Sequence, residues 1–389
     1  MQFSVIRRLS GVAVIFMVLS GGCAAVLEPP KPGVEVSDLG LAVESEESSS
    51  RIRVKTLAHG LKEPWAMDFL PDGRLLVTEK SGTLKLIDLI SGEMADVAGV
   101  PAVVNVGQGG LMDVKVHPQF TENQQLYITY TVERDGAYST QLSSVRLQRG
   151  RLQDHQVLFT AEPFFSQRRH FGSRVLLDEG YLYLTVGDRG NRDLAQSLAS
   201  HNGKVLRLHA DGRVPTDNPF VNVDGAKPEI WTYGHRNPQG LRKHPFTGEL
   251  WISEHGPQGG DEVNALRRGA NYGWPVITYG EEYGGGKIGE GTLKSGMEQP
   301  LTYYTPSIGT AGMDFYSGRI YPGWEPSLLV AGLRQSQIAR LELTDSGVGV
   351  RTRLMANLSM RVRSVVVGPD GLIYALADGS RLIRLQPEP

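Results

Sequence analysis

The stretch LDEGYLYLTVGD, residues 177–188, joins a turn to a strand. Asp178, Glu179 and Gly180 form a polar turn cluster, and the next six residues alternate leucine or valine with tyrosine or threonine. Successive side chains of a strand point to opposite faces, so this alternation is typical of a β-strand. The combination recurs as LPDGRLLVTE (70–79), FTENQQLYITYT (120–131), PFTGELWISEH (245–255), WEPSLLVAGL (324–333) and GPDGLIYALAD (368–378).

These six copies are spaced widely enough for a four-stranded sheet at each one. Their anchor residues are Leu75, Leu126, Leu182, Leu250, Leu328 and Ile373. No long segment after Arg51 has helical periodicity, and 47 Gly with 22 Pro are typical of a chain with many tight turns. We therefore predict an all-β fold, a six-bladed β-propeller of four-stranded antiparallel blades. Residues 51–57 and 381–387 both resemble strands and are expected to share one blade, so that 51–389 form one catalytic domain.

The first 23 residues have the pattern of a secretory signal. Arg7 and Arg8 precede an apolar run over 9–19, and small residues lead to Cys23. Cys23 is the sole cysteine, which excludes an internal disulfide. Its position is similar to a bacterial lipoprotein cleavage site, although Leu19 lies one position further away than usual. We expect a periplasmic or extracellular protein, with a membrane tether through acylated Cys23 or, alternatively, simple secretion.

Residues 24–50 are rich in acids, Pro and Ser and poor in large apolar side chains, which predicts a flexible linker. The whole chain carries a net charge of −2. Because several acids lie in the linker, the remainder is close to neutral and offers no broad basic face for nucleic acid. No interface motif is evident, so a monomer is expected.

The stretch YGHRNPQGLRKHPFTGELWISEHGPQGGDE, from Tyr233 to Glu262, concentrates polar groups on both sides of one short strand. Arg236, Asn237 and Gln239 stand within four residues, and an Arg fork beside two amides suits a ligand rich in carboxylate and carbonyl oxygens. His235 and His255 are interpreted as scaffold, because neither has a helix-spaced partner for zinc.

The segment after that strand, EHGPQGGDE, suggests a site for a hard cation. The turn at Gly256 and Pro257 can direct consecutive carbonyls at one ion, with Asp261 and Glu262 adding negative charge. The spacing is not that of an EF-hand loop. The carbonyls therefore suggest a hard cation here, without support from a known loop motif.

Two further candidates lie earlier in the chain. Gln108, in VGQGGLMDVKVHP (106–118), has an amide that can donate and accept, and glycines around it allow close backbone approach; the alternative is an ordinary turn. His170 lies in QRRHFGSR (167–174), where neighbouring arginines favour the neutral imidazole that a general base needs. The alternative for His170 is a solvated basic turn.

Three arginines near the end of the chain suggest an anionic ligand. Arg334 follows the fifth copy, and Arg361 and Arg363 precede the sixth. Alternate residues of a strand share a face, so Arg361 and Arg363 point the same way. The alternative is a solvated strand edge.

The motifs GQGG, RHFGSR, GHRNPQGL, EHGPQGGDEVN, NYGWP and RVRSVVVGPDG, in this order, resemble the soluble PQQ-dependent aldose sugar dehydrogenases of bacteria. The resemblance covers nearly all of the chain after the linker. It implies a six-bladed propeller that holds pyrroloquinoline quinone (PQQ) and calcium, and that oxidises the anomeric carbon of an aldose to the lactone. The electron acceptor is left unspecified.

By this resemblance each candidate residue acquires a role. His170 is similar to the family's general base, and Gly256 and Pro257 fall on the backbone calcium ligands. Glu262 and Tyr272 lie where some relatives have further calcium ligands. The residues that fall on PQQ contacts are Gln108, Arg236, Asn237, Gln239, Arg334, Arg361 and Arg363.

The chain also departs from the pattern. Arg334 stands where a Lys is expected, and Arg169 precedes His170 where the glucose enzymes have an acid, which puts their way of orienting the histidine in doubt. The Gly-rich segment 279–297 does not align and is expected to line the mouth of the site. The other functions considered are a calcium-dependent propeller lactonase, which would offer carboxylates and Asn to its metal, and a non-catalytic glycan-binding propeller.

Overall fold

The structure is a computed structural model that describes residues 37–45, 48–324, 326–334, 337–344, 347–355, 358 and 360–387, with side chains from Ile52 onward. These residues fall in one compact unit, Pro32–Pro389. The expected leader, 1–23 with Cys23, lies outside the described residues, as does the first part of the expected linker. Within the described part, no helix combines the length and the apolar character that a membrane span requires.

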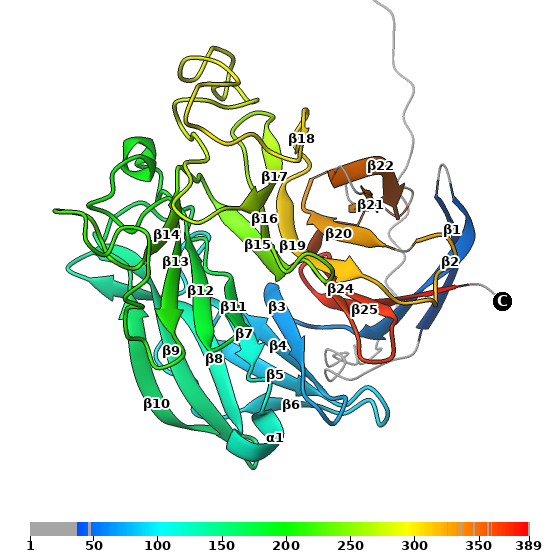
Figure 1. Cartoon of the computed structure of the whole chain (residues 1–389). Helices are drawn as coiled ribbons and strands as arrows, with labels where there is room; N and C mark the ends of the chain where they lie inside the picture. Colours follow the sequence, from blue (N-terminus) through cyan, green and yellow to red (C-terminus); the bar gives the residue numbers. More distant parts are fainter. Residues whose placement is uncertain are drawn as a thin grey trace, which may run out of the picture. The chain divides into compact units, whose positions relative to one another are not determined.

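Six antiparallel sheets follow one another along the chain (Figure 1). Blade 1 contains β3 (Pro64–Phe69), β4 (Leu75–Glu79), β5 (Thr83–Ile87) and β6 (Met94–Val97). Blade 2 contains β7 (Leu111–Val116), β8 (Gln125–Arg134), β9 (Ala137–Gln148) and β10 (Arg151–Thr160), with α1 (Phe120–Asn123) after β7. Blade 3 contains β11 (Val175–Asp178), β12 (Tyr181–Val186), β13 (Lys204–His209) and β14 (Ile230–Tyr233), with the 3₁₀ helix η1 (Arg192–Ala195) after β12.

The second half of the chain repeats the arrangement. Blade 4 contains β15 (Pro238–Lys243), β16 (Leu250–Glu254), β17 (Asp261–Leu266) and β18 (Thr302–Tyr304). Blade 5 contains β19 (Thr310–Tyr316), β20 (Ser327–Gly332), β21 (Gln337–Thr344) and β22 (Gly347–Leu354). Blade 6 contains β23 (Val362–Val367), β24 (Ile373–Ala377) and β25 (Arg381–Pro387), joined by β2 (Ser48–Ala58) and β1 (Ser37–Ser45).

The two ends of the chain meet in blade 6. Strand β2 pairs with β25 so that Val54 lies opposite Leu385, which confirms the expected sharing of one blade. Strand β1 then pairs with β2 as a fifth strand. Residues 37–45 and 48–50 thus lie in strands although their composition suggested linker. The alternating Leu39, Leu41 and Val43 are a strand pattern that an average over the acidic segment conceals.

The first strand of each blade is the innermost. Contacts join β3 to β7, β7 to β11, β11 to β15, β15 to β19, β19 to β23, and β23 back to β3, so these strands close a ring. Aspartates on the inner strands tie adjacent blades together. Asp68 accepts the amide of Val116 at 2.8 Å, and Asp113 accepts that of Val175 at 2.9 Å. The all-β six-bladed propeller predicted from the repeats is confirmed.

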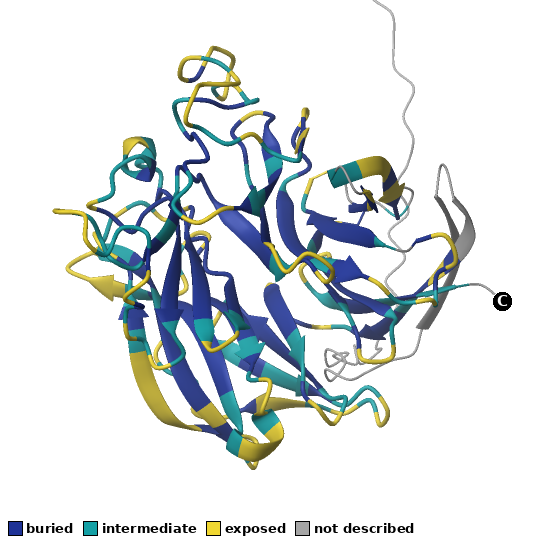
Figure 2. Cartoon of the chain, in the orientation of Figure 1, coloured by how far each residue is buried: buried dark blue, intermediate teal, exposed yellow. Residues whose placement is uncertain are grey.

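The repeated sequence unit is the second strand of each blade. All six anchor residues are buried within β4, β8, β12, β16, β20 and β24. Figure 2 shows that burial is concentrated in the inner strands, whereas the outer strand β10 is largely exposed. Each fully buried aliphatic side chain contributes about 1.5–3 kcal/mol to the free energy of unfolding. The apolar faces that neighbouring sheets turn to one another therefore hold the blades together.

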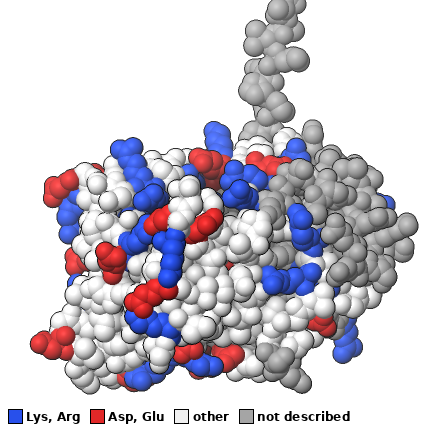
Figure 3. Space-filling view, turned by 90° about the horizontal axis from the view of Figure 1, so that it is seen from above, with Lys and Arg blue, Asp and Glu red and all other residues white. Residues whose placement is uncertain are grey.

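Charges are mixed on the face of the protein seen in Figure 3. In the view of Figure 3, basic and acidic side chains are interspersed among the described residues, with no extended patch of one sign. This distribution agrees with the near-neutral charge expected for the propeller.

Candidate active site

A cavity of about 680 Å³ lies over the inner strands and is built by loops of all six blades. Loops that enter the inner strands contribute Glu63, Gly107, Gln108, His170, Arg236, Asn237 and Arg361, and the inner strands themselves contribute Pro64, Trp65, Gln239 and Arg363. Turns after the second strands contribute Lys80, His255, Leu333, Arg334, Asp378 and Gly379, and the loop between β17 and β18 contributes Tyr283. The volume is in the range of small-molecule sites.

The structure brings the general-base candidate and all predicted cofactor contacts into this one cavity. Gln108, His170, Arg236, Asn237, Gln239, Arg334, Arg361 and Arg363 all line it. The expectation that the Gly-rich segment 279–297 reaches the mouth is met by Tyr283, which is 71% exposed.

His170 is held in a defined orientation by Asp188. The Nδ1 atom of His170 lies 2.7 Å from Oδ1 of Asp188, and the other carboxylate oxygen accepts the indole N–H of Trp274 at 2.8 Å. A carboxylate facing Nδ1 fixes the proton on that nitrogen and leaves Nε2 as the acceptor. The acid that orients the histidine therefore comes from the turn after β12, and the departure at Arg169 does not remove it.

The pKa values of this pair suit a base. Burial lowers the pKa of His170, the hydrogen bond to Asp188 opposes that shift, and the charge of Arg236 adds to it. Burial raises the pKa of Asp188, but its hydrogen bonds with His170 and with the amide of Gly190, together with the charge of Arg236, leave the net pKa below the ordinary value. The carboxylate is therefore ionised and the imidazole neutral at pH 7.

Gln239 joins two other residues at the cavity wall. Its Oε1 accepts a hydrogen bond from Nη1 of Arg363 at 2.7 Å and lies 3.1 Å from Nε2 of His255. Burial, with repulsion from Arg363 and Arg236, lowers the pKa of His255 well below its usual value. His255 was interpreted as scaffold from sequence, but it lines the cavity, so that interpretation is corrected.

Arg236 and Asn237 are fixed from behind the cavity. The amide of Arg236 donates to Glu254 at 2.8 Å, and its guanidinium Nη1 donates to the carbonyl of His255 at 3.2 Å. Oδ1 of Asn237 accepts the amide of Gly172 at 3.1 Å, two residues after His170. Arg236 is thus held within blade 4, and Asn237 connects the wall of blade 4 with the loop that carries the imidazole.

The cavity carries an excess of positive charge. Five cationic side chains and two carboxylates line it, an excess of three. Lys80 pairs with Glu63 at 3.0 Å, whereas the guanidinium of Arg363 makes its hydrogen bond to the neutral Gln239. Burial and repulsion from Arg174 and Arg361 lower the pKa of Arg363 to about 10. An anionic ligand is the natural complement of such a wall.

The turn at Gly256 and Pro257 has the features of a carbonyl site for a cation. Both residues are buried, and among the described residues neither carbonyl accepts a hydrogen bond. Asp261 holds the turn by accepting the amide of Gly256 at 2.9 Å. A Cβ at Gly256 would lie only 2.2 Å from the carbonyl oxygen of Gly260, so the turn requires glycine there. Buried carbonyls without partners fit a calcium ion.

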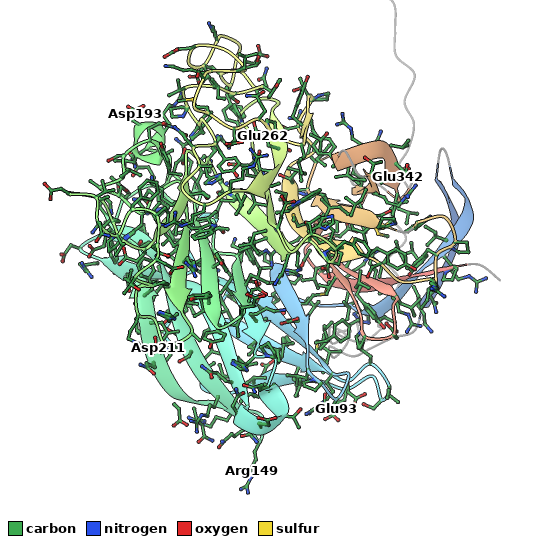
Figure 4. The ribbon with its side chains drawn as sticks, in the orientation of Figure 1. Glu93, Arg149, Asp193, Asp211, Glu262 and Glu342 are labelled. Carbon is green, nitrogen blue, oxygen red and sulfur yellow. The ribbon has the colours of Figure 1, made fainter. Side chains whose placement is uncertain are left out.

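Glu262 and Tyr272 are placed less favourably for a second ion. Figure 4 places Glu262 in blade 4, where it pairs with Glu254 across strands β17 and β16. Burial and the charge of Glu254 raise the pKa of Glu262. The hydroxyl of Tyr272 instead donates to the carbonyl of Ala265 at 2.6 Å. The described residues contain no cluster of three or more His, Cys, Asp or Glu side chains suited to a metal.

His235 belongs to the scaffold, in agreement with its sequence interpretation. It is fully buried, lies 2.9 Å from Oε1 of Glu254 and stacks on Tyr272 with ring centroids 4.8 Å apart. Its carboxylate partner also holds the amide of Arg236, so His235 supports the cavity wall from outside.

Asp188, Trp274 and His255 are the residues that sequence reasoning missed. Asp188 ends the repeated unit LTVGD, and Trp274 lies in the motif NYGWP, so both stood in recognised motifs. A turn aspartate directly after a strand of an active-site blade was the available signal for Asp188. Only the fold shows that Asp188 binds His170 and that Trp274, far away in the chain, binds the other oxygen of Asp188.

Comparison with known proteins agrees with this geometry. Residues 61–384 match the family model "Glucose / Sorbosone dehydrogenase". The aldose sugar dehydrogenase YliI of Escherichia coli is 38% identical over 345 residues, which cover 86% of this chain and 93% of that protein. The crystal structure of the soluble aldose sugar dehydrogenase of E. coli in its apo-form superposes with a TM-score of 0.84 at 37% identity, covering 87% and 100% of the two chains.

A ligand-bound structure is also similar. The PQQ-bound form of an aldose sugar dehydrogenase from Streptomyces coelicolor superposes with a TM-score of 0.71 at 27% identity, covering 87% of this chain and 99% of that one. The family model spans most of the propeller and all of the loops that build the cavity. The chain therefore belongs to the glucose/sorbosone dehydrogenase family.

Proposed function

We propose that this protein is a PQQ-dependent aldose sugar dehydrogenase that oxidises the anomeric carbon of an aldose to the lactone. The observation that carries the proposal is a cavity in which an excess of three positive charges stands beside an oriented, neutral His170. The first feature suits a bound polyanion, and the second suits removal of a proton from a sugar hydroxyl. The family and the PQQ-bound relative support the same assignment.

The residues of the cavity fit PQQ, which is a tricarboxylate. Arg361 and Arg363 from blade 6, with Arg236 and Arg334, supply guanidinium donors for its carboxylates. Gln108, Asn237 and Gln239 supply amide donors and acceptors for its carbonyl oxygens and ring nitrogens. Among these residues, Arg363 is the best supported as a PQQ contact, because it is partly buried and its hydrogen bond in the cavity goes to a neutral amide.

PQQ, when bound, supplies the quinone that accepts the hydride from the anomeric carbon. His170 receives the proton of the anomeric hydroxyl at Nε2, so that the hydroxyl becomes the lactone carbonyl as the hydride leaves. Asp188 stabilises the imidazolium that forms and keeps the ring from rotating. Trp274 fixes the far oxygen of that carboxylate, which prevents Asp188 from turning away.

Gly256 and Pro257 are proposed to hold a calcium ion through their carbonyls. Such an ion polarises an oxygen at which negative charge develops. Asp261 keeps the turn in place through the Gly256 amide. Glu262 remains a proposed ligand of a second calcium because it is a partly buried acid beside Glu254, whereas the hydrogen bond of Tyr272 to Ala265 gives that residue no comparable support.

The cellular setting rests on the leader. A secretory signal over 1–23 places the protein in the periplasm or outside the cell, and acylation of Cys23 would anchor it to a membrane. Mass spectrometry of the mature N-terminus tests this anchor: a diacylglyceryl mass on Cys23 supports it, and an unmodified terminus contradicts it.

The function is tested by reconstitution. Purified protein is incubated with PQQ and calcium, and reduction of an artificial dye is followed with a panel of aldoses. We expect dye reduction that needs PQQ, calcium and sugar together, with the aldonolactone as product. A protein that binds PQQ with no dye reduction by any aldose contradicts the proposal. Hydrolysis of lactones with calcium alone would favour the lactonase, and glycan binding without either reaction would favour the binding module.

A further inference from the structure

The backbone of His170 is held in an unfavourable conformation. Its φ angle is +54°, in the left-handed region that residues with a Cβ avoid. Such a conformation persists only where the surroundings determine it strongly, and it commonly marks a functional site. The contacts around residues 167–170 therefore show what keeps the imidazole facing the cavity.

Every carbonyl from Gln167 to His170 accepts a hydrogen bond, and Arg189 supplies three of the four. Its guanidinium donates to Gln167 and, at 3.0 Å, to Arg169, and its own amide donates to His170 at 3.3 Å. The amide of Gln108 donates to the remaining carbonyl, that of Arg168, at 2.9 Å.

Arg189 is also completely buried, which is rare for an arginine. The third arm of its guanidinium donates to the carbonyl of Tyr138 at 2.7 Å, and its carbon lies 3.6 Å from the ring centroid of Phe171. All the groups that accept hydrogen bonds from the side chain of Arg189 are thus neutral backbone carbonyls. Burial lowers its pKa to about 9, which reflects the cost of enclosing a charge among neutral groups.

The position of Arg189 in the chain couples it to the orienting acid. It directly follows Asp188, whose Oδ1 binds His170 and whose amide donates to the carbonyl of Arg236 at 2.8 Å. One short turn therefore holds the imidazole through Asp188 and the backbone beneath that imidazole through Arg189. A displacement of the 167–170 backbone would move Nε2 away from the cavity even with Asp188 intact.

We infer that Arg189 is a positioning residue for His170. The guanidinium of Arg189 holds the backbone carbonyls around the histidine so that Nε2 of His170 faces the bound sugar. The inference rests on the proposed role of His170 as the base. Arg189 itself does not line the cavity. A fork of donors is required, because one ammonium group cannot reach the three carbonyls in the same geometry.

The test compares Arg189→Met and Arg189→Lys with the matched control Arg168→Ala, which removes an exposed arginine of the same segment. We expect Arg189→Met to lower kcat by about ten- to hundredfold through misplacement of the base, with KM for the aldose and affinity for PQQ within twofold of the wild type. The kcat of Arg189→Lys should lie between those of Arg189→Met and the wild type, and Arg168→Ala should keep the wild-type kcat.

A second readout does not depend on turnover. In cofactor-free protein labelled with ¹⁵N-histidine, the Nδ1 proton that His170 shares with Asp188 should give a downfield NMR signal, assigned by its loss in His170→Ala. We expect that signal to shift or disappear in Arg189→Met and to persist in Arg168→Ala, while thermal unfolding stays cooperative. If Arg189→Met does not fold, the signal in Arg189→Lys decides: a shift or loss supports the inference.

An unchanged His170 signal and kcat in a folded Arg189 variant, with only a lower Tm, overturns the inference and leaves Arg189 a purely stabilising residue. A fall in kcat together with PQQ affinity, at an unchanged His170 signal, overturns it too. Failure of the proposed function is recognised separately, because wild-type protein would then not oxidise aldoses with PQQ and calcium. The NMR comparison still decides the positioning role in that case.

Discussion

Nδ1 of His170 in the loop before β11 lies 2.7 Å from the carboxylate of Asp188 in the turn after β12. Both groups are buried, and Trp274 from blade 4 fixes the second oxygen of the carboxylate. This arrangement leaves one imidazole nitrogen for chemistry and gives it a defined direction. The proposed base and its orienting acid come from one blade, and the cationic residues of the wall come mainly from blades 4, 5 and 6.

Replacing His170 by alanine should reduce turnover without releasing the cofactor. Loss of a general base lowers the rate by roughly 10²–10⁴-fold, whereas the arginines proposed to bind PQQ remain. The measurement is kcat with a good aldose, together with the Kd for PQQ from its absorbance. His155→Gln serves as the control, since His155 lies in β10 of blade 2, away from the lining of the cavity. Retention of full kcat in His170→Ala would assign the base to another residue.

Replacing Asp188 by asparagine should lower kcat and move the pH profile. The pKa of His170 lies below its ordinary value of 6.5, so the acid limb of kcat/KM in the wild type should lie below pH 6.5. The hydrogen bond and the charge of Asp188 both raise the pKa of His170. Their removal therefore shifts the limb to lower pH, while loss of the fixed tautomer lowers kcat by roughly a hundredfold or more. A limb that moves to higher pH contradicts this assignment.

Replacing Arg363 by glutamine should weaken the binding of PQQ. A hydrogen bond to a charged group contributes about 1.5–3 kcal/mol, which corresponds to about a tenfold to hundredfold rise in Kd. Arg361→Gln should have a smaller effect because Arg361 is exposed. Arg351→Gln is the matched control, since its guanidinium donates to Tyr303 on the outer edge of blade 4. Equal PQQ affinity in Arg363→Gln and Arg351→Gln would remove Arg363 from the cofactor site.

The repeats and motifs predicted the fold and most of the cavity for a physical reason. A second strand such as β12 is buried on both faces and framed by tight turns, so its pattern is strong in sequence, and residues such as Arg236 lie beside recognisable turns. The position of His255 and the partner of His170 were not predictable in this way. Both depend on how loops of different blades come together over the inner strands. The periodicity within one segment carries no information about which loops of other blades lie beside it.

Replacing Gly256 by alanine should abolish the response of the protein to calcium. The added Cβ would lie 2.2 Å from the Gly260 carbonyl oxygen and 2.3 Å from that of Gly259, so the turn must open and its carbonyls must move. We expect calcium to raise the Tm of the wild type and to leave that of Gly256→Ala unchanged. Gly291→Ala is the control, since no atom lies within 4 Å of its added Cβ. A full calcium response in Gly256→Ala would place the ion elsewhere.

Removing the second strand of the chain should destabilise blade 6. A chain that begins after Ala58 lacks β2, whose Ile52 and Val54 are fully buried, and leaves the edge of β25 unpaired. Loss of these two side chains alone lowers the free energy of unfolding by at least about 3 kcal/mol. The unpaired edge of β25 also favours aggregation. We expect a large drop in Tm and in soluble yield. A chain that begins at Ser48 loses β1 but keeps β2, so it should retain near-wild-type stability. If the chain that begins after Ala58 were equally stable, the pairing of β2 with β25 would not be what holds blade 6 together.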